Sequence, residues 1–503
     1  MIVGDHRRIL IPVLAREQGG GRLKGLRCVH THLAGEGISD DDLMDLLFLR
    51  LDLMAVLTMN EEGLPEKIHP VHLLPQPVDG KNWRFLPAVH PARLPATFLD
   101  TITALEEEFA RARAGREVGR GEDRAILVSV TTASRQAAEE SMAELVELAR
   151  SDNVTVLDTV IQRRAAIHPK WIMGKGKLAE IMLAALTLNA NLLIFDQELN
   201  PSQIRSVTDS TEMRVIDRTQ LILDIFARRA RSREGKLQIE MAQLRYMLPR
   251  LGSRDDALSR LTGGIGGRGP GETRLEIDRR RISDRLARLA DKLKGVARER
   301  HYRRSRRRKK SLPVLSLVGY TNAGKSTLLN TLTKSGVVAE DKLFATLDPT
   351  SRRLRFPEDI EVIMTDTVGF IRNLPEELIK AFRSTLEELH EADLLIHVID
   401  ASSPWVHDQV AVVENLLAEM DLDGIPLLRV LNKKDRISAE QERLLSEELG
   451  GIPVSALDAD SLNPLLERAR QLVADKWRAI AENGDDGIHA DGEAEADDRW
   501  PAG

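Results

Sequence analysis

The sequence predicts a multidomain α/β protein in which a P-loop domain, with a mixed and mostly parallel sheet, follows an α/β subdomain and a helical hairpin. Three observations predict this. Residues 125–230 alternate strand-like apolar runs with helical stretches, which is typical of a parallel sheet with helical crossovers. Residues 231–297 carry two heptad patterns separated by glycines. Residues 314–327 read as strand, glycine turn and helix, the context of a phosphate-binding loop.

The bulk composition limits the class of protein. At roughly 150 residues per domain, 503 residues allow three or four domains, and 42% apolar residues can form ordinary cores. Cys28 is the only cysteine, which excludes an intrachain disulfide and fits a reducing compartment. The start lacks a signal-peptide pattern, and no apolar run approaches the ~20 residues of a membrane span. We therefore expect a soluble intracellular protein.

Charge is distributed unevenly behind a net value of −6. Residues 298–310 contain nine Lys or Arg and one acid, whereas residues 482–498 contain eight acids and no Lys or Arg. This segregation predicts a basic arm that faces a polyanion and a solvated acidic tail. A solvated linker remains the alternative interpretation of the basic run.

Two regions precede the hairpin. Residues 1–95 mix short apolar runs with Pro and Gly breaks and predict an extra N-terminal α/β region of unknown role. Residues 96–124 read as a charged helical connector. In residues 125–230 the expected strands are "AILVSVTT", "NVTVLDTVI", "NLLIFD" and "MRVIDR", and the helices between them are "AAEESMAELVELARS" and "KLAEIMLAALTL".

Residues 231–297 predict an antiparallel helical hairpin with a glycine-rich tip. The apolar positions step by four and three at Leu237, Met241, Leu244, Leu248 and Leu251, and again at Ile282, Leu286, Leu289, Leu293 and Val296. The tip, "GGIGGRGPG", has six glycines in nine residues, which no helix tolerates. It could be a flexible connector. We favour a backbone-rich finger that approaches another surface, with charge from Arg268 and Arg274, because such a tip is costly to order.

Residues 312–477 form the predicted P-loop domain, with residues 298–311 as a basic linker before it. The amides of residues 322–326 can converge on phosphates at a helix N-terminus. Lys325 is expected to reach the β- and γ-phosphates, and Ser326 to ligate Mg²⁺.

The nucleotide base is predicted by "LNKKD" and "VSAL". Asp435 can accept hydrogen bonds from both N1–H and N2–H₂ of guanine, a pair that adenine does not offer. Asn432 and the stem of Lys433 are expected to hold the loop and cover the base. The backbone of Ser455 and Ala456 can donate to guanine O6. The ligand predicted by these residues is GTP.

Two further motifs lie between the P-loop and the base motif. Asp366 ends a predicted strand and can hold Mg²⁺ through water, and the Gly369 amide can sense the γ-phosphate. Thr346 and Thr350 are both candidates to complete the Mg²⁺ shell. The order of motifs is the layout of a P-loop GTPase domain.

The complete set of expected nucleotide contacts is larger. It comprises Gly319, Tyr320, Thr321, Asn322, Ala323, Gly324, Lys325, Ser326, Phe344, Ala345, Thr346, Leu347, Asp348, Asp366, Thr367, Val368, Gly369, Asn432, Lys433, Lys434, Asp435, Ser455, Ala456 and Leu457.

Two residues bear on the rate of hydrolysis. Phe370 occupies the position where small signalling GTPases have the glutamine that orients the attacking water, so we expect slow intrinsic hydrolysis. Asn322 matches GTPases in which this asparagine helps to hold K⁺ beside the β- and γ-phosphates. A simple turn residue is the alternative interpretation of Asn322.

The assembled residues resemble the HflX family of ribosome-associated GTPases over about residues 125–475, roughly 70% of the chain. Stretches similar to that family include "MGKGKLAEI", "LIFDQELNPSQIR", "VIDRTQLILDIFARRA", "EGKLQIEMAQLRYMLPRL", "GGIGGRGPGETRLEIDRRRI" and "LFATLDPTSRRL". The resemblance implies binding to the large ribosomal subunit and its rRNA, and splitting of stalled or idle ribosomes with ribosome-stimulated GTP hydrolysis. It also implies that the glycine-rich tip reaches toward the peptidyl transferase centre.

The resemblance further implies specific roles. Thr346 is the Mg²⁺-linked switch threonine, and Lys325, Thr346, Asp366 and Gly369 form the catalytic set. We expect a cytoplasmic monomer that binds the ribosome, with a fraction of the protein at the membrane periphery. The alternative is a GTP-dependent RNA-binding or ribosome assembly factor without splitting activity.

Both ends depart from this family. Residues 478–503 are acidic and predict a disordered tail. In the N-terminal extension, His30, His32, Ser39 and Asp42 resemble the H-x-H…S-x-x-D pattern of JAMM-type zinc hydrolases, but one residue short before the serine. Glu17 is the only glutamate upstream. Two His, one Asp and water would make a catalytic zinc shell. We favour the alternative, surface histidines beside a helix N-cap at Ser39.

Overall fold

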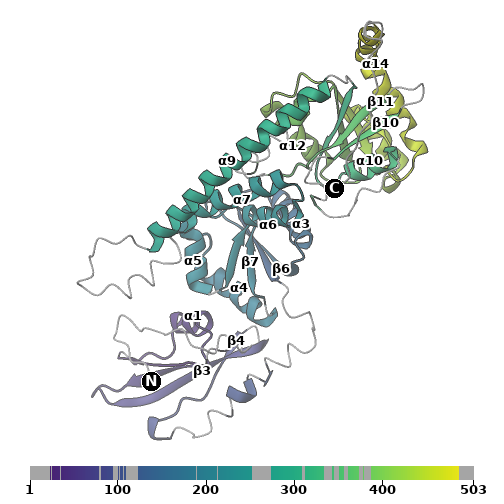
Figure 1. Ribbon diagram of the computed structural model, residues 1–503. Helices are drawn as coiled ribbons and strands as arrows, with labels where there is room; N and C mark the ends of the chain where they lie inside the picture. Colours follow the sequence, from purple (N-terminus) through teal and green to yellow (C-terminus); the bar gives the residue numbers. More distant parts are fainter. Residues whose placement is uncertain are drawn as a thin grey trace. The chain divides into compact units, whose positions relative to one another are not determined.

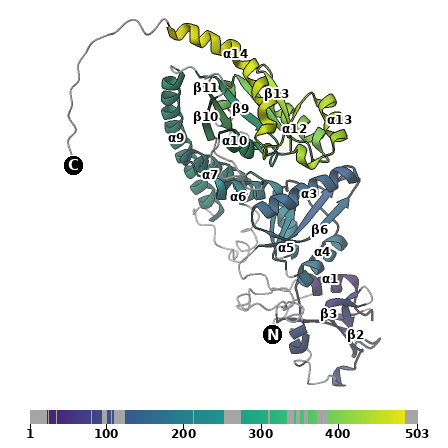
Figure 2. The same ribbon diagram turned by 90° about the vertical axis from the view of Figure 1, so that its right-hand side faces the viewer.

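The computed structural model describes residues 23, 25–33, 35–78, 81–93, 100, 102–105, 107–108, 123–188, 190–211, 213–251, 274–308, 312–333, 343–344, 350–355, 361–372, 378 and 387–485. These residues fall into two compact units, one drawn from Met1–Leu221 and Arg250–Gly269 and the other from Ile222–Pro249 and Pro270–Gly503. Figures 1 and 2 show the ribbon of the chain in two views. Within the described part of the chain, no helix combines the length and the apolar character that crossing a bilayer requires.

The first unit begins with a four-stranded sheet and one helix. β1 (Arg27–His32) and β2 (Leu53–Met59) are parallel, and α1 (Asp40–Phe48) connects them. β3 (Pro65–Val78) and β4 (Lys81–Phe85) follow as antiparallel strands, which gives the order β1-β2-β3-β4. Leu46 and Leu47 make α1 amphipathic, and both are buried in an apolar core that continues to Leu178 and Met182 of α4 (Lys175–Leu188).

A second sheet of the first unit is parallel throughout, in the order β6-β5-β7-β8. Its strands are β5 (Arg124–Thr131), β6 (Thr155–Arg163), β7 (Leu192–Phe195) and β8 (Arg214–Asp217). The other helices of this region are α3 (Arg135–Ser151) and α5 (Pro201–Thr211), and α6 (Arg218–Arg229) continues from Ile222 into the second unit. All four residues of β7 are buried, as expected for the apolar run of an inner parallel strand. The α/β alternation predicted from the sequence is confirmed.

In the second unit, two helices lie side by side (Figure 1). They are α7 (Arg233–Met247), which is followed by the short helix η3 (Leu248–Arg250), and α9 (Arg274–Arg308). Glu240 of α7 and Arg285 of α9 form an ion pair of 2.6 Å between them. The predicted tip, residues 263–271, lies outside the described residues.

The apolar seam of this helix pair differs from the heptad prediction on α7. On α9, Leu289 is fully buried and the other predicted positions are half-buried. On α7 the predicted leucines are only half-buried. The buried residues there are Gly235, Gln238, Ile239, Ala242 and Tyr246. A heptad pattern identifies positions with large apolar side chains. It does not identify a buried helix face that contains small residues such as Gly235 and Ala242, which permit close approach of a neighbouring helix.

Two predicted boundaries are wrong. α9 continues to Arg308, so most of the segment predicted as a basic linker is helical. After Gly295 this segment contains no Gly or Pro, and arginine is a good helix former. α14 (Asn463–Asp485) likewise continues past residue 477, so residues 478–485 are helix rather than disordered tail. Residues 486–503 lie outside the described residues.

The rest of the second unit is a six-stranded sheet in the order β10-β11-β9-β12-β13-β14. The strands are β9 (Val314–Gly319), β10 (Thr350–Arg355), β11 (Glu361–Asp366), β12 (Leu394–Asp400), β13 (Leu427–Asn432) and β14 (Ile452–Pro453). Only β10 is antiparallel to its neighbour. The helices include α10 (Lys325–Thr333), α12 (Val406–Glu419) and α13 (Ala439–Leu449). The carboxyl ends of the parallel strands meet at one edge, where ligands of such sheets bind.

Candidate nucleotide-binding site

The turn from β9 into α10 has the geometry of a phosphate-binding loop. Gly319 has φ +151°, and a Cβ atom there would lie 2.2 Å from the carbonyl oxygen of Val398. Gly324 has φ +96°, and a Cβ atom would lie 2.3 Å from Nδ2 of Asn432. Only glycine fits at either position. The loop therefore lies directly against the neighbouring strand ends, and its amides precede the N-terminus of α10.

Lys325 is buried beneath this loop. Its Nζ donates to the carbonyl oxygens of Gly319 (3.0 Å) and Tyr320 (2.8 Å). Burial lowers the pKa of Lys325 to about 8, although the nearby charge of Asp366 raises it. A buried ammonium group that is desolvated in this way favours an anionic ligand beside it. Both the backbone amides of the loop and the Lys325 ammonium group are therefore positioned to bind phosphate.

Ser326 and Asp366 meet at the next point of the site. The hydroxyl of Ser326 donates to Oδ2 of Asp366 at 2.6 Å, and Asp366 is fully buried at the end of β11. Thr367 is fixed through its hydroxyl, which donates to the carbonyl oxygen of Leu317 (2.6 Å). A hydroxyl and a carboxylate at this spacing are the hard oxygen donors that Mg²⁺ prefers.

The D-x-x-G segment closes on the P-loop. The amide of Thr321 donates to the carbonyl oxygen of Phe370 (2.8 Å), and the amide of Phe370 donates to that of Gly319 (3.1 Å). A Cβ atom at Gly369 would lie 3.1 Å from Nζ of Lys325, so this glycine sits beside the phosphate-facing lysine. Phe370 itself is buried, as an apolar side chain at this position should be.

Asn432 joins the P-loop to the base-recognition loops. Its Nδ2 donates to the carbonyl oxygen of Ala323 (2.7 Å), and its Oδ1 accepts from the amide of Ala456 (2.9 Å). The residue is buried. The side chain of Asn432 therefore connects its own N-K-x-D motif to the P-loop and to the Ser-Ala segment.

The rim of the site carries the base-recognition groups. Asp435 is exposed, and its Oδ1 accepts from the hydroxyl of Ser455 at 2.6 Å. Lys433 has φ +64°, and its Nζ pairs with Oδ2 of Asp400 at 2.7 Å. The amide of Lys434 donates to the carbonyl oxygen of Val454 (3.1 Å). Leu457 is 76% exposed and adds an apolar surface beside Ala456.

The predicted first switch is described only in part. Phe344 is buried, and its ring centroid lies 4.6 Å from that of Phe226, which belongs to α6. Its side chain therefore packs in the protein interior, and the nucleotide contact predicted for this residue stays a prediction. Thr350 begins β10 in register with Asp366. Residues 345–348, which include Thr346, lie outside the described residues.

The residues predicted to contact rRNA and those predicted as zinc ligands differ in how far the structure describes them. Arg268 lies outside the described residues, and Arg274 is the first residue of α9, with its side chain undescribed. His30, His32 and Asp42, in contrast, converge within the first unit.

Sequence reasoning missed two supporting residues. Asp400 positions Lys433, and Thr331 donates to the carbonyl oxygen of Ala456 at 2.6 Å. The end of the apolar run "LLIHVID" was a usable signal for Asp400, because strand ends meet at the ligand edge. Nothing in the local sequence marks Thr331, whose role depends on a contact 125 residues away in the chain.

Comparison with known proteins agrees with this geometry. Residues 139–227 match the family described as GTP-binding GTPase N-terminal, residues 229–307 the GTP-binding GTPase Middle Region, and residues 314–433 the 50S ribosome-binding GTPase. GTPase HflX of Caldanaerobacter subterraneus subsp. tengcongensis is 47% identical over 351 residues, which cover 70% of this chain and 81% of that relative. The chain belongs to the GTPase HflX family.

Other similarities of this HflX-family chain extend over comparable lengths. GTPase HflX of Escherichia coli K12 is 47% identical over 309 residues, 61% of this chain and 72% of that relative. A solved structure of a GTP-binding protein from the archaeon Sulfolobus solfataricus in complex with GDP is 25% identical and covers 70% of this chain and 99% of that one, with a TM-score of 0.39. The family predicted from the sequence is confirmed. The protein is a GTPase with a P-loop GTP-binding domain.

Proposed function

We propose that this HflX-family GTPase uses Mg²⁺-bound GTP to bind the large ribosomal subunit and to separate stalled or idle ribosomes into subunits. The observation that carries the ribosomal part is the match of residues 314–433 to a family described as a 50S ribosome-binding GTPase. A ribosomal partner also implies a cytoplasmic location and a monomer that associates with the particle. The order of events rests on the site described above.

GTP binding uses three sets of groups. The loop amides and Lys325 hold the phosphates, because the buried ammonium group gains an anionic partner. Asp435 accepts the two guanine N–H groups, while the hydroxyl of Ser455 fixes its orientation. Leu457 lies beside the base.

The Mg²⁺ site is formed by Ser326, with Asp366 acting through water and Thr346 from the first switch. The 2.6 Å contact between Ser326 and Asp366 is the observation that fits this ion. When bound, Mg²⁺ neutralises charge that develops on the β- and γ-phosphates. Asp366 holds the serine hydroxyl in place, and Gly369 gives its amide access to the γ-phosphate beside Lys325.

Hydrolysis is slow in the isolated protein. Phe370 is buried and apolar, so it cannot orient the attacking water. We place K⁺ beside Asn322, an exposed residue of the P-loop turn with φ +61°, as one source of the missing stabilisation. The ribosome is the second source, and hydrolysis then releases the protein because the switches lose their contacts with the γ-phosphate.

The contact with rRNA is made by the hairpin. The basic residues of the C-terminal part of α9 neutralise phosphates, and the glycine-rich tip with Arg268 and Arg274 approaches RNA by shape and backbone contact.

Sucrose gradients of purified 70S ribosomes test this function. With a non-hydrolysable GTP analogue, the protein should convert monomers to subunits, and the variant without residues 263–271 should bind GTP but leave monomers intact. Monomers that persist with the intact protein would instead favour an RNA-binding or ribosome assembly factor. If the shortened protein splits ribosomes as well as the intact one, the tip is only a connector.

A further inference from the structure

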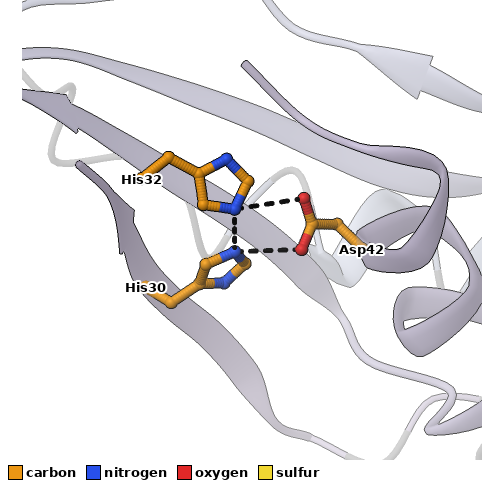
Figure 3. A group of neighbouring side chains, drawn as sticks. All are labelled: His30, His32 and Asp42. Carbon is orange, nitrogen blue, oxygen red and sulfur yellow. Dashed lines mark hydrogen bonds and ion pairs between the residues drawn. The ribbon is translucent and has the colours of Figure 1, made fainter. Parts of the chain in front are cut away.

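Three side chains that the GTPase cycle does not use converge in the N-terminal sheet (Figure 3). His30 and His32 alternate along β1 and therefore face the same side, and Asp42 lies in the first turn of α1. The Nε2 atoms of the two histidines are 3.0 Å apart. Oδ1 of Asp42 lies 3.0 Å from Nε2 of His30, and Oδ2 lies 3.5 Å from Nε2 of His32.

The hydrogen bonds around this cluster orient its lone pairs inward. Nδ1 of His32 lies 3.1 Å from the carbonyl oxygen of Glu36 and 3.0 Å from that of Gly37. Carbonyl oxygens only accept, so this Nδ1 carries a hydrogen, and in the Nδ1–H tautomer the Nε2 lone pair faces the cluster. The carboxylate of Asp42 is fixed by the amide and hydroxyl of Ser39, both at 2.8 Å from Oδ2.

With the Nδ1–H tautomer of His32, the three contacts bring together more lone pairs than hydrogens. The Asp42 carboxylate only accepts, and so does Nε2 of His32. Among the three facing groups, only Nε2 of His30 can then carry a hydrogen, and that hydrogen can be donated to one partner at a time. A cation at the centre of the triangle accepts lone pairs from all three groups at once.

The contacts within this cluster are close to the separations between ligands of one zinc ion. With metal–ligand distances of about 2.0–2.1 Å, neighbouring ligands of a tetrahedral zinc ion lie about 3.3 Å apart. Here the two Nε2 atoms are 3.0 Å apart, and each of them lies 3.0 or 3.5 Å from one of the two Asp42 carboxylate oxygens. One ligand atom from each of the three residues lies within 4.8 Å of the others. Imidazole nitrogen ligands favour zinc and related transition metals over Mg²⁺ or Ca²⁺.

We propose that His30, His32 and Asp42 bind a zinc ion in the N-terminal extension. Three protein ligands leave the fourth position for water or an exogenous ligand, as in catalytic zinc sites. His30 is 32% exposed at its side chain, so that position is open to solvent on one side. The hydrogen bonds of His32 and of Asp42 are the outer contacts that orient ligands in known zinc sites. The site lies upstream of the segments 139–227, 229–307 and 314–433 that match the known families.

Metal analysis of the full-length, untagged protein tests the proposal. After growth with zinc and dialysis against metal-free buffer, the wild-type protein should hold one zinc ion per chain. His30→Ala, His32→Ala and Asp42→Asn should each lose it. His90→Ala, which removes an exposed histidine of the same region, should keep it.

Two further measurements separate ligand loss from misfolding. Asp42 also completes the capping box of α1. We therefore use Asp42→Asn, because the side-chain amide oxygen that replaces a carboxylate oxygen can still accept hydrogen bonds from Ser39. Ser39→Ala keeps all three ligands and should weaken zinc affinity by only about tenfold. Co²⁺ added to the metal-free wild-type protein should give visible absorption bands that the histidine variants lack.

Each outcome decides the proposal. It is overturned if the wild-type protein holds no more zinc than the His30→Ala variant, while circular dichroism and GTP affinity show both to be folded. It is also overturned if His90→Ala loses zinc to the same extent, since binding would then be nonspecific. Zinc that is retained by the wild-type and His90→Ala proteins, held more weakly by Ser39→Ala and lost from the three ligand variants supports the site.

Discussion

At the scale of single residues, we propose that nucleotide choice depends on one exposed carboxylate. Asp435 is positioned by the hydroxyl of Ser455 and can accept two hydrogen bonds from guanine. Asp435→Asn turns one acceptor into a donor, so GTP affinity should fall by about 2 kcal/mol, roughly thirtyfold, and xanthosine triphosphate should bind more tightly. Calorimetry with both nucleotides checks this. Asp423→Asn, at an exposed turn, should leave GTP preference unchanged, and a retained preference in Asp435→Asn would remove the base assignment.

The second residue-scale prediction concerns the proton on Lys325. Burial lowers its pKa to about 8 in the empty protein, and bound phosphates should raise it. Binding above pH 8 must then be coupled to uptake of a proton, so affinity for GTP is constant below pH 8 and weakens by up to about tenfold per unit above it. Calorimetry in buffers of different ionisation enthalpy should detect proton uptake at pH 8.5 and little at pH 7. Equal uptake at both values would mean that Lys325 is not the group that titrates.

At the scale of elements, the contact between Phe226 and Phe344 connects α6 to the first switch. Phe344 lies two residues before Thr346, and both rings are buried. Phe226→Leu should leave a small cavity, cost about 1–2 kcal/mol of unfolding free energy and accelerate release of fluorescent GTP, because the switch loses its anchor. Stopped-flow release measurements check the rate.

A matched core change provides the control for this contact. Phe195 is equally buried, but it lies in β7 of the first unit. Phe195→Leu should lower the melting temperature to a similar degree and leave GTP release unchanged. If both variants release GTP at the same rate, the aromatic pair contributes only to stability.

The same elements indicate what a sequence can predict. The strands and helices of residues 125–230 and the motifs around Lys325 carry local signals, namely apolar runs, glycine turns and fixed spacing. The burial of Phe344 against Phe226 depends on tertiary packing across more than a hundred residues, so no local pattern contains it. The convergence of Asp42 with His30 could be predicted only in part from the sequence. Its spacing was visible, and the predicted N-cap at Ser39 is confirmed. The contacts of His32 with the Glu36 and Gly37 carbonyls depend on the path of the loop, which no local pattern contains.

At the scale of the whole molecule, the chain combines an HflX GTPase with an N-terminal extension for which we propose a separate zinc site. The GTP site lies in the second unit, and the proposed zinc ligands lie in the first. Their ligand sets share no residue. Removal of zinc should therefore leave GTP affinity unchanged, which makes nucleotide binding a suitable check of folding for the zinc variants.

The rate of the GTPase cycle is also a property of the whole molecule and its partner. Because Phe370 is buried and apolar, it cannot orient the attacking water, and we expect slow turnover by the isolated protein. Purified ribosomes should raise kcat by at least about a thousandfold, the range in which a supplied stabilising group acts. Rates with K⁺ should exceed those with Na⁺, and Asn322→Ala should remove that difference while it retains GTP binding.

The two sources of stimulation can be distinguished by one set of rates, measured with and without ribosomes in each salt. Equal rates in K⁺ and Na⁺ would exclude the ion at Asn322 but leave ribosomal stimulation intact. Rates that do not respond to ribosomes would exclude the ribosome as the source of the missing group. The hydrolysis site would then have to be completed from within the chain, and the segment around Thr346 would be the first place to test, because it approaches the γ-phosphate in the proposed cycle.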